Sequence, residues 1–236
     1  MKKNTYTKRI FYTYWLLTLF VSIFTSGLHA ASPADQTLRY AVDFMGQSAG
    51  EIEVTIKREG DEYLVTSISH PSLMAQMFLE SYTLESRFSL DGEQLQLKSG
   101  KEILSETGEV QREFNVNHDN KVLSFSAGEP LNLPEGIRIE ADSFPLLLMS
   151  SDLNSLAGQT YLSVSPKRAR QYVYQEPEQE SLSIPAGEFS TIKIVGVRTD
   201  SPDRKVNVWL NTGDQQIPVR ITTSKDGRET TMTLME

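Results

Sequence analysis

The stretch LRYAVDFMGQSAGEIEVTIKREG, from Leu38 to Gly60, decides the fold class. Apolar residues occupy every second position in its first part, LRYAVDF, and again in its later part, EIEVTIK. Apolar and polar residues that alternate with a period of two indicate a half-buried β-strand. Between the two parts lies GQSAG (Gly46 to Gly50), whose glycines can adopt the positive φ angles of a tight turn. The stretch therefore predicts two antiparallel strands joined by a short hairpin.

The same alternation continues along the rest of the chain, interrupted by turn sequences such as EGDE at Glu59, DG at Asp91 and KDG at Lys225. The further strands are expected at 63–69, 82–90, 95–103, 110–116, 122–125, 161–164, 172–174, 181–184, 189–197, 206–210, 217–223 and 230–234. Many strands at this spacing, joined by hairpins, form one sheet long enough to bend on itself. We therefore expect an all-β protein with an antiparallel sheet of ten or more strands, curled into a barrel or half-barrel.

Two segments break the alternation, and each predicts a short helix. PSLMAQMFLES (Pro71 to Ser81) places a leucine, two methionines and a phenylalanine on one helical face. ADSFPLLLMSSDLNSLAG (Ala141 to Gly158) has capping residues and a proline at its start, a block of four apolar residues, and a glycine at its end. We expect one or both helices to cover the concave face of the sheet.

The first thirty residues predict a secretory signal peptide. A basic start, KKNTYTKR, precedes an apolar run of 15 residues from Ile10 to Phe24, and small residues follow. The run is shorter than the roughly 20 residues of a membrane-spanning helix. We expect cleavage after Ala30, export to the periplasm, no integral membrane span after processing, and a single β-barrel-like domain over residues 31–236. An uncleaved amino-terminal anchor is the alternative.

Charge and cysteine content exclude several classes of function. The chain contains no cysteine, which excludes disulfides, thiol catalysis and thiolate metal sites. Its net charge of −8 becomes −12 once the four basic residues of positions 1–30 are removed. A chain this acidic, without a basic cluster, is a poor partner for nucleic acid or for an anionic membrane surface.

The GQSAG stretch also matches G-x-S-x-G, the pattern that presents a nucleophilic serine in α/β-hydrolases. In that fold a helix follows the serine directly, whereas here a strand pattern follows Gly50. Downstream of the signal peptide the chain has only two histidines, His70 and His118, and no spacing typical of a zinc site. We therefore interpret Ser48 as a turn residue and expect a protein that is not an enzyme, with no catalytic residue, no metal site and no cofactor.

The two helical segments suggest a binding site with specific lining residues. Against the concave face of the sheet they would line a cavity for an apolar ligand, because methionine side chains adapt to varied shapes. The residues expected to line this cavity are Met74, Met77, Phe78, Leu147 and Met149. The alternative is that the same residues complete a closed core.

These observations favour a non-catalytic periplasmic protein that binds an apolar or amphipathic ligand, or a partner protein of the cell envelope. Two alternatives stay open. One is a structural or assembly factor of the envelope that has no small-molecule ligand. The other is a glycan-processing enzyme whose paired carboxylates come from separate strands.

Several segments together resemble a known family. SIPAGEFSTIKIVGV (Ser183 to Val197) resembles a strand entry of that family, and VNVWLNTGDQQIPVRITTSKDG (Val206 to Gly227) resembles one of its hairpins. With YAVDFMGQSAG and DSFPLLLMSSDL, they resemble the domain of unknown function 3108 family of secreted bacterial proteins. The shared positions are structural glycines, prolines and aromatics, so the resemblance implies a fold rather than a chemistry. SLDGEQLQLKSG lacks the proline usual at a strand start in that family, which leaves the register of the middle strands open.

The hairpin from Trp209 to Arg220 is also similar to one in periplasmic lipoprotein carriers, whose half-open barrels hold acyl chains under a helical lid. This weaker resemblance implies a concave face that is able to hold an apolar chain. In physical terms we expect Trp209 to cover one end of the core and Gly213 to form the turn. Pro218 is expected at an edge where no backbone amide is needed.

Overall fold

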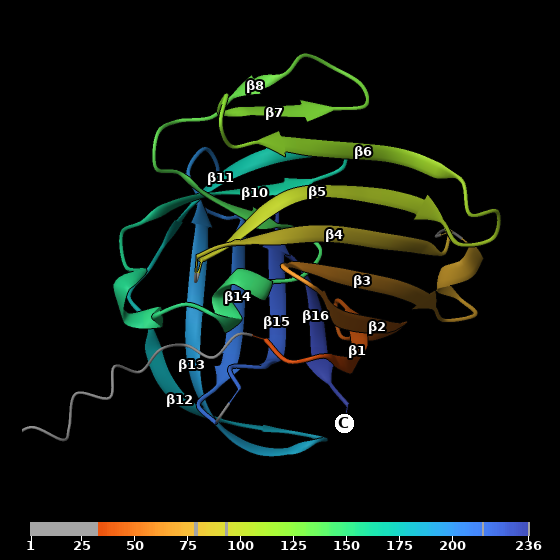
Figure 1. The fold of residues 1–236 in the computed structure, drawn as a ribbon. Coiled ribbons are helices and arrows are strands. Elements are labelled where there is room, and N and C mark those ends of the chain that lie inside the picture. The colour runs from red at the N-terminus through yellow and green to blue at the C-terminus, as the bar shows by residue number, and fades with distance from the viewer. Residues whose placement is uncertain (1–32, 78–79, 93, 214, 236) are drawn as a thin grey trace, which may run out of the picture. The chain divides into compact units, whose positions relative to one another are not determined.

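The structure is a computed structural model, and it describes residues 33–77, 80–92, 94–213 and 215–235. Sixteen strands join one hydrogen-bonded sheet (Figure 1). The strands follow the order β8-β7-β6-β5-β4-β3-β2-β1-β16-β15-β14-β13-β11-β10-β9, and β12 pairs with β13 beyond the end of β11. The sheet is not closed, because this order has two ends. The predicted all-β class and large sheet are confirmed.

The first arm of the sheet is a meander in which each strand pairs with the next along the chain. Its strands are β1 (Gln36–Phe44), β2 (Gln47–Glu59), β3 (Glu62–Pro71), β4 (Tyr82–Asp91), β5 (Gln94–Leu104), β6 (Val110–Asn117), β7 (Val122–Phe125) and β8 (Leu131–Asn132). Every pair in this arm is antiparallel, because the chain reverses its direction between consecutive strands.

The second arm continues from β1, which pairs with the last strand of the chain. Its strands are β9 (Arg138–Ala141), β10 (Thr160–Ser165), β11 (Arg168–Tyr174), β12 (Glu178–Ile184), β13 (Gly187–Arg198), β14 (Lys205–Asn211), β15 (Pro218–Lys225) and β16 (Arg228–Leu234). One pair, β9 with β10, is parallel. This pair differs from the expected antiparallel arrangement because the long segment between the two strands crosses over instead of forming a hairpin.

The predicted turn between β1 and β2 forms, but it consists of Met45 and Gly46, and the rest of the GQSAG stretch belongs to β2. Gly46 and Gly50 have φ angles of 77° and 135°, which favour glycine. Ser48 is a strand residue and not the predicted turn residue, because it belongs to β2 and pairs with Asp43 of β1. A strand follows the serine, so the backbone of a nucleophile elbow is not formed here.

The core lies on the concave face of the sheet, where the alternating apolar residues of both arms meet. Tyr40 of β1 is fully buried, and its hydroxyl donates a hydrogen bond of 2.8 Å to the carbonyl of Pro218. Its ring centroid is 6.3 Å from that of Phe144, a residue of the crossover segment. The period-two pattern that predicts the strands therefore also predicts which side chains face this core.

Polar contacts bridge the two arms across the concave face. Ser86 of β4 is hydrogen-bonded to Ser143 at 3.0 Å. Lys167, in the turn between β10 and β11, is 3.2 Å from the buried carboxylate of Glu102 in β5, and Arg112 contacts the same carboxylate at 3.0 Å. The Ser143 contact joins the crossover segment to β4, and the Lys167 contact joins the β10–β11 turn to β5.

The helix predicted for Ala141 to Gly158 forms only in part. Leu146–Met149 makes one helical turn, α2, and Leu153–Ser155 makes a 3-10 turn, η2. All four residues of α2 are buried, and Figure 1 shows this green segment in front of β14 and β15. Between the two turns, Ser150 and Ser151 both donate their hydroxyls to the carbonyl of Leu147. Such bonds compete with the helical hydrogen bonds, which explains why the helix stops.

The helix predicted for Pro71 to Ser81 is reduced to the 3-10 turn η1, Ala75–Met77. The backbone amide of Ser72 bonds to the carbonyl of Ala49 at 2.9 Å, so sheet pairing continues past the end of β3. Because the chain stays with the sheet, Leu73, Met74 and Met77 do not turn toward the core. Of the two segments, as far as the structure describes them, the one with α2 and η2 covers the concave face.

The hairpin from Trp209 to Arg220 forms, with two differences from the expectation. Trp209 alternates with buried residues of β14 and lies on the convex face, where its indole donates to Glu180 of β12. Pro218 is not at a sheet edge, because β15 lies between β14 and β16. It is tolerated as the first residue of the strand, where the pairing with β14 shifts register.

Candidate functional site

A cleft of about 520 Å³ lies between the start of β5, the turn after β6, β9 and the α2–η2 segment. This volume is in the range of about 300–1,000 Å³ that is common for small-molecule sites. Its polar lining comprises Gln94, Gln96, His118, Arg138, Ser150, Ser151, Asp152, Ser155 and Gln159. Leucine and isoleucine side chains form the remainder. The cleft is therefore a mixed surface in which hydrogen-bonding groups predominate.

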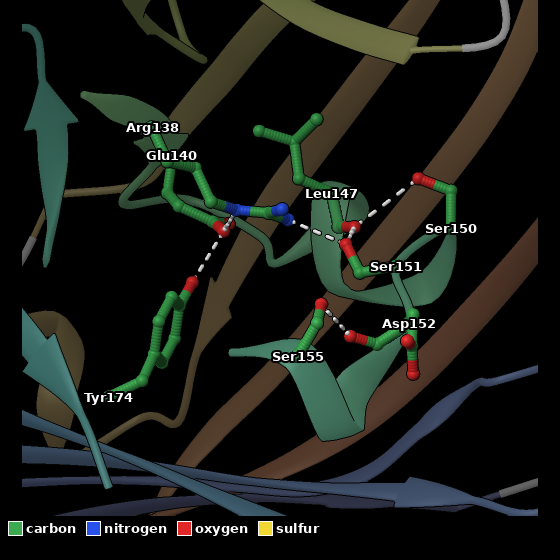
Figure 2. Close-up of polar contacts among 8 residues, drawn as sticks. All are labelled: Arg138, Glu140, Leu147, Ser150, Ser151, Asp152, Ser155 and Tyr174. Atoms are coloured by element: carbon green, nitrogen blue, oxygen red, sulfur yellow. Dashed lines mark hydrogen bonds and ion pairs between the residues drawn. The ribbon is translucent and has the colours of Figure 1, made fainter. Parts of the chain in front are cut away.

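Arg138, on the edge strand β9, is the fixed cation of this cleft (Figure 2). Its Nε donates to Oε1 of Glu140 at 2.5 Å, and its Nη2 donates to Oγ of Ser151 at 2.8 Å. The same Glu140 oxygen accepts the Tyr174 hydroxyl at 2.6 Å. Glu140 is almost fully buried, whereas 24% of the Arg138 side chain stays accessible. The guanidinium is thus held in one orientation while part of it faces the cleft.

The charges of this cluster stabilise each other. Burial disfavours the charged form of Arg138, but the charge and hydrogen bond of Glu140, together with Tyr174, outweigh burial and raise the pKa of the guanidinium. Burial, and then the charge of Glu140, raises the pKa of the Tyr174 hydroxyl, so this phenol stays a hydrogen-bond donor. The Tyr174 ring also stacks on Tyr161, with centroids 4.2 Å apart. A guanidinium fixed in this way is suited to donate hydrogen bonds to an oxygen-rich group.

The serines of the crossover segment form the opposite wall of the cleft. Ser151 accepts a hydrogen bond from Arg138 and donates its own to the Leu147 carbonyl, so it links β9 to α2. Asp152 caps η2 by accepting the amide of Asn154 at 3.1 Å. Ser155 donates to the backbone carbonyl of Asp152 at 2.8 Å. These internal bonds make the wall a preformed surface, as Figure 2 shows.

His118 closes the cleft on the side of the first arm. Its Nε2 is 2.8 Å from the backbone carbonyl of Leu97 in β5. Because a carbonyl only accepts hydrogen bonds, Nε2 of His118 carries a proton and donates it to this bond. The sequence offered no signal for this role, since the histidine stands in a turn sequence, NHDNK.

A second, smaller cavity of about 110 Å³ lies beneath α2. Phe144 and Leu148 form one side of it, and Ile194, Val208 and Ile221 of the sheet form the other. Its volume is well below the range of about 300 Å³ and more that small-molecule sites usually occupy. The apolar space between helix and sheet is therefore almost filled by side chains.

The structure separates the residues that were expected to line one cavity. Leu147 lines the polar cleft, and Met149 is buried in α2. Met74 and Met77 lie on the surface, 75% and 68% exposed. The reason is that the chain after β3 continues to pair with β2 through Ser72 and does not fold over the core. Phe78 lies outside the described residues. The described members of the set do not line a common cavity.

The cleft offers hydrogen bonds rather than an assembled reaction centre. Asp152 is the one carboxylate among its described lining residues. Over the described part of the chain, no group of three or more acidic or histidine side chains is placed to hold a metal ion. The arrangement can bind and orient a polar group through Arg138, the serines and the glutamine amides.

The curled sheet, open along one side and filled by a short helix, defines a β-barrel-like protein. A solved structure with this fold is the β-barrel-like protein of domain of unknown function DUF1849 from Brucella abortus, with a TM-score of 0.50. The two chains are 11% identical, over 84% of this chain and 94% of that one. A likeness at this identity shows the fold alone.

Comparison of the sequence with protein-family models and with curated protein sequences found no match. The resemblance to the domain of unknown function 3108 family therefore stays a prediction. The signal peptide with its cleavage after Ala30 also stays a prediction, because residues 1–32 lie outside the described part of the chain. In the described residues, no helix has the length and apolar character needed to cross a bilayer.

Proposed function

We propose that this protein is a non-catalytic periplasmic binding protein that holds a polar or amphipathic ligand in the cleft around Arg138. The observation that carries the proposal is a guanidinium fixed by Glu140 and Ser151 at the wall of a 520 Å³ cleft. Preformed sites of this size with a few oriented polar groups are typical of ligand binding. The basic, apolar amino terminus supports export, and the absence of cysteine is compatible with it.

The ligand is proposed to carry oxygen-rich groups instead of being purely apolar. An acyl chain would need the space beneath α2, and that cavity measures only about 110 Å³. The larger cleft presents Gln96, Arg138 and Gln159 next to leucine and isoleucine side chains. A ligand with both hydroxyl or carboxylate groups and a short apolar part matches this lining.

The proposal of binding without catalysis rests on the carboxylates of the cleft. Hydrolysis of a glycan by the usual mechanism needs two carboxyl groups on either side of the scissile bond, about 5–9.5 Å apart. In the described lining only Asp152 supplies such a group, and its side chain caps η2. This geometry favours binding over a glycan-processing reaction.

The test compares two arginines that each pair with a buried glutamate. Arg138→Lys keeps the positive charge beside Glu140 but removes the planar fork that reaches Ser151, whereas Arg112→Lys makes the same change at Glu102, outside the cleft. The mature protein, purified gently from envelope extracts, is analysed by native mass spectrometry for a bound compound. The compound found is then titrated into the protein while backbone amide resonances are recorded by NMR.

We expect the compound to shift the resonances of Gly136, Arg138 and the segment 150–155. Its dissociation constant should rise by about tenfold or more in Arg138→Lys and stay unchanged in Arg112→Lys. A protein that never carries a ligand, or a ligand that binds Arg138→Lys as tightly as the natural protein, would contradict the proposal.

A further inference from the structure

Several large apolar side chains are exposed at one end of the first arm of the sheet. Leu73, Met74 and Met77, around η1, are 85%, 75% and 68% exposed. Phe44, the last residue of β1, and Met45, in the turn that follows, are 46% and 56% exposed. Single exposed apolar residues are ordinary on a protein surface, but a group of this size in neighbouring loops marks an interaction site.

Hydrogen bonds show that these loops lie side by side. Ser72, which precedes the η1 residues, donates its amide to Ala49 and its hydroxyl to Ser48, just after the β1–β2 turn. On the other side of η1, the amide of Ser105 in the β5–β6 turn donates to the carbonyl of Ser81 at 3.0 Å. The described residues 44–51, 70–77, 80–82 and 104–110 therefore lie along one margin of the sheet, which we call the apolar rim.

The charged residues of the apolar rim are of one sign. Its segments contain Glu51, Glu80, Glu106 and Glu109, and they contain no lysine or arginine. All four glutamates are exposed. One of them, Glu80, accepts the Tyr82 hydroxyl at 2.5 Å. The rim thus combines a group of adaptable apolar side chains with an acidic border of four exposed glutamates. Two cations near Tyr82, Lys167 and Arg112, are both paired with the buried carboxylate of Glu102.

We propose that the apolar rim is a docking surface for a partner protein whose binding segment is amphipathic and cationic, with apolar side chains flanked by lysine or arginine. The methionines would adapt to the apolar face of that segment, and the four glutamates would meet its positive charges. The acidic border disfavours an anionic lipid surface, and it disfavours a second copy of the same rim, because like charges would face each other.

The rim is a different site from the cleft around Arg138. The cleft is lined by the beginning of β5, Gln94 to Leu97, and the rim is formed by the turn that follows its end at Leu104. A strand advances about 3.3 Å per residue, so the two sites lie roughly 25 Å apart along the same strand. The proposal therefore does not depend on the ligand proposed for the cleft.

A model peptide tests the proposal directly. The probe is a fluorescent helical peptide of about 18 residues built from leucine and lysine with one apolar face, and its counterpart has glutamate in place of lysine. Binding to the mature protein is followed by fluorescence anisotropy. We expect the leucine–lysine peptide to bind and the leucine–glutamate peptide not to bind. Binding should weaken as salt is added, because the charges at the rim are exposed.

Matched variants distinguish peptide binding at the rim from attraction of the peptide to the overall negative charge of the protein. The apolar variant carries Leu73→Ser, Met74→Ser and Met77→Ser, and its control carries Leu131→Ser, a change at an exposed leucine of β8. The charge variant carries Glu→Gln at 80, 106 and 109, and its control carries the same change at three exposed glutamates elsewhere, at 129, 176 and 188. Each control removes similar chemistry outside the rim.

We expect both rim variants to weaken peptide binding by about tenfold or more and both controls to leave it nearly unchanged. Equal weakening in the charge variant and its control would show attraction to overall charge and overturn the proposal. Zwitterionic lipid vesicles and sedimentation of the protein alone complete the test. Binding to such vesicles that the apolar variant abolishes, or a dimer that it dissociates, would assign the rim to a membrane or to self-association and overturn the partner proposal.

Discussion

Two short apolar segments of this protein have similar compositions, but one is buried and the other is exposed to solvent. Leu146–Met149 forms α2 and is completely buried against the concave face of the sheet. The residues from Leu73 to Met77 form η1 at the margin of the sheet and are mostly exposed. Both segments follow a proline and both are rich in leucine and methionine. Local composition therefore does not decide which apolar segment enters the core.

The difference comes from what the chain does on either side of each segment. The segment with α2 connects β9 to β10, a parallel pair, and must cross over the face of the sheet to do so. The segment with η1 connects β3 to β4, an antiparallel pair, and can stay at the end of the two strands. Connection geometry thus places one segment over the core and the other beside it.

The largest expected effect is at the centre of the buried segment. Leu146 is fully buried, so Leu146→Ala removes apolar contacts and leaves a cavity. We expect the free energy of unfolding to fall by about 2–5 kcal/mol. Chemical denaturation of the mature protein measures this change. A loss below about 1 kcal/mol would mean that α2 is not packed as tightly as its burial indicates.

A smaller effect is expected where the exposed segment is attached to the sheet. Gly50 has a φ angle of 135°, and a Cβ atom there would lie 2.2 Å from the carbonyl oxygen of His70. We expect Gly50→Ala to cost about 1–3 kcal/mol of stability and to speed hydrogen exchange at Ser72.

The matched control for this change is Gly46→Ala in the same hairpin. Gly46 also has a positive φ, 77°, but a Cβ atom there would meet nothing within 4 Å. Only the conformational cost of about 1–2 kcal/mol applies, without faster exchange at Ser72. Equal exchange in the two variants would show that the contact with His70 does not anchor the exposed segment.

High pH should lower the stability of the protein through the buried core and not through the exposed η1 segment. Burial raises the pKa of the Tyr40 hydroxyl in the folded protein. Its contribution to stability is fully present below about pH 10 and is lost as the pH rises above that value, because the unfolded chain then releases the proton. The loss is about 1.4 kcal/mol per pH unit for each such tyrosine.

The variant Tyr40→Phe measures how much of the stability lost at high pH comes from Tyr40. The variant should be less stable at neutral pH, because the Pro218 carbonyl loses its partner. Between about pH 10 and 11 its stability should fall less steeply than that of the natural protein. Thermal unfolding across this range gives both slopes, and identical slopes would contradict the burial of a protonated phenol at this position.

The smallest expected effect is at the exposed methionines. Met74→Ala and Met77→Ala should change the free energy of unfolding by no more than about 0.5 kcal/mol, because the side chains are already in water. Chemical denaturation measures this change as well. A loss of about 2 kcal/mol or more would place these methionines in a packed environment and would remove the contrast with Leu146.

The hairpins are the part of the fold that follows from the sequence with little ambiguity. The alternation in LRYAVDF and EIEVTIK sets both the strand type and the face that is buried, and Tyr40 and Val54 are indeed in the core. Gly46 marks the turn and Gly50 marks the irregular pairing of β2 with β1, because few other residues adopt their φ angles. Both signals are local, since they depend on the conformation of adjacent residues alone.

The cleft could not be predicted in the same way. Arg138, Ser151 and His118 each belong to a different element, and no spacing in the chain relates them. They meet because the crossover between β9 and β10 returns the chain to the first arm. The buried pair of Arg138 and Glu140 is equally invisible in the sequence, where RIEA reads as an ordinary polar and apolar alternation.

The sequence by itself determined the all-β class, the hairpin turns and the inward face of most strands, because those depend on backbone preferences and a period of two. Tertiary structure alone decided three other features. It buried α2 and left η1 in solvent, it put Trp209 on the convex face, and it joined Arg138 to Ser151 across the cleft. The physical reason is common to all three, since each depends on which distant strands become neighbours when the sheet curls.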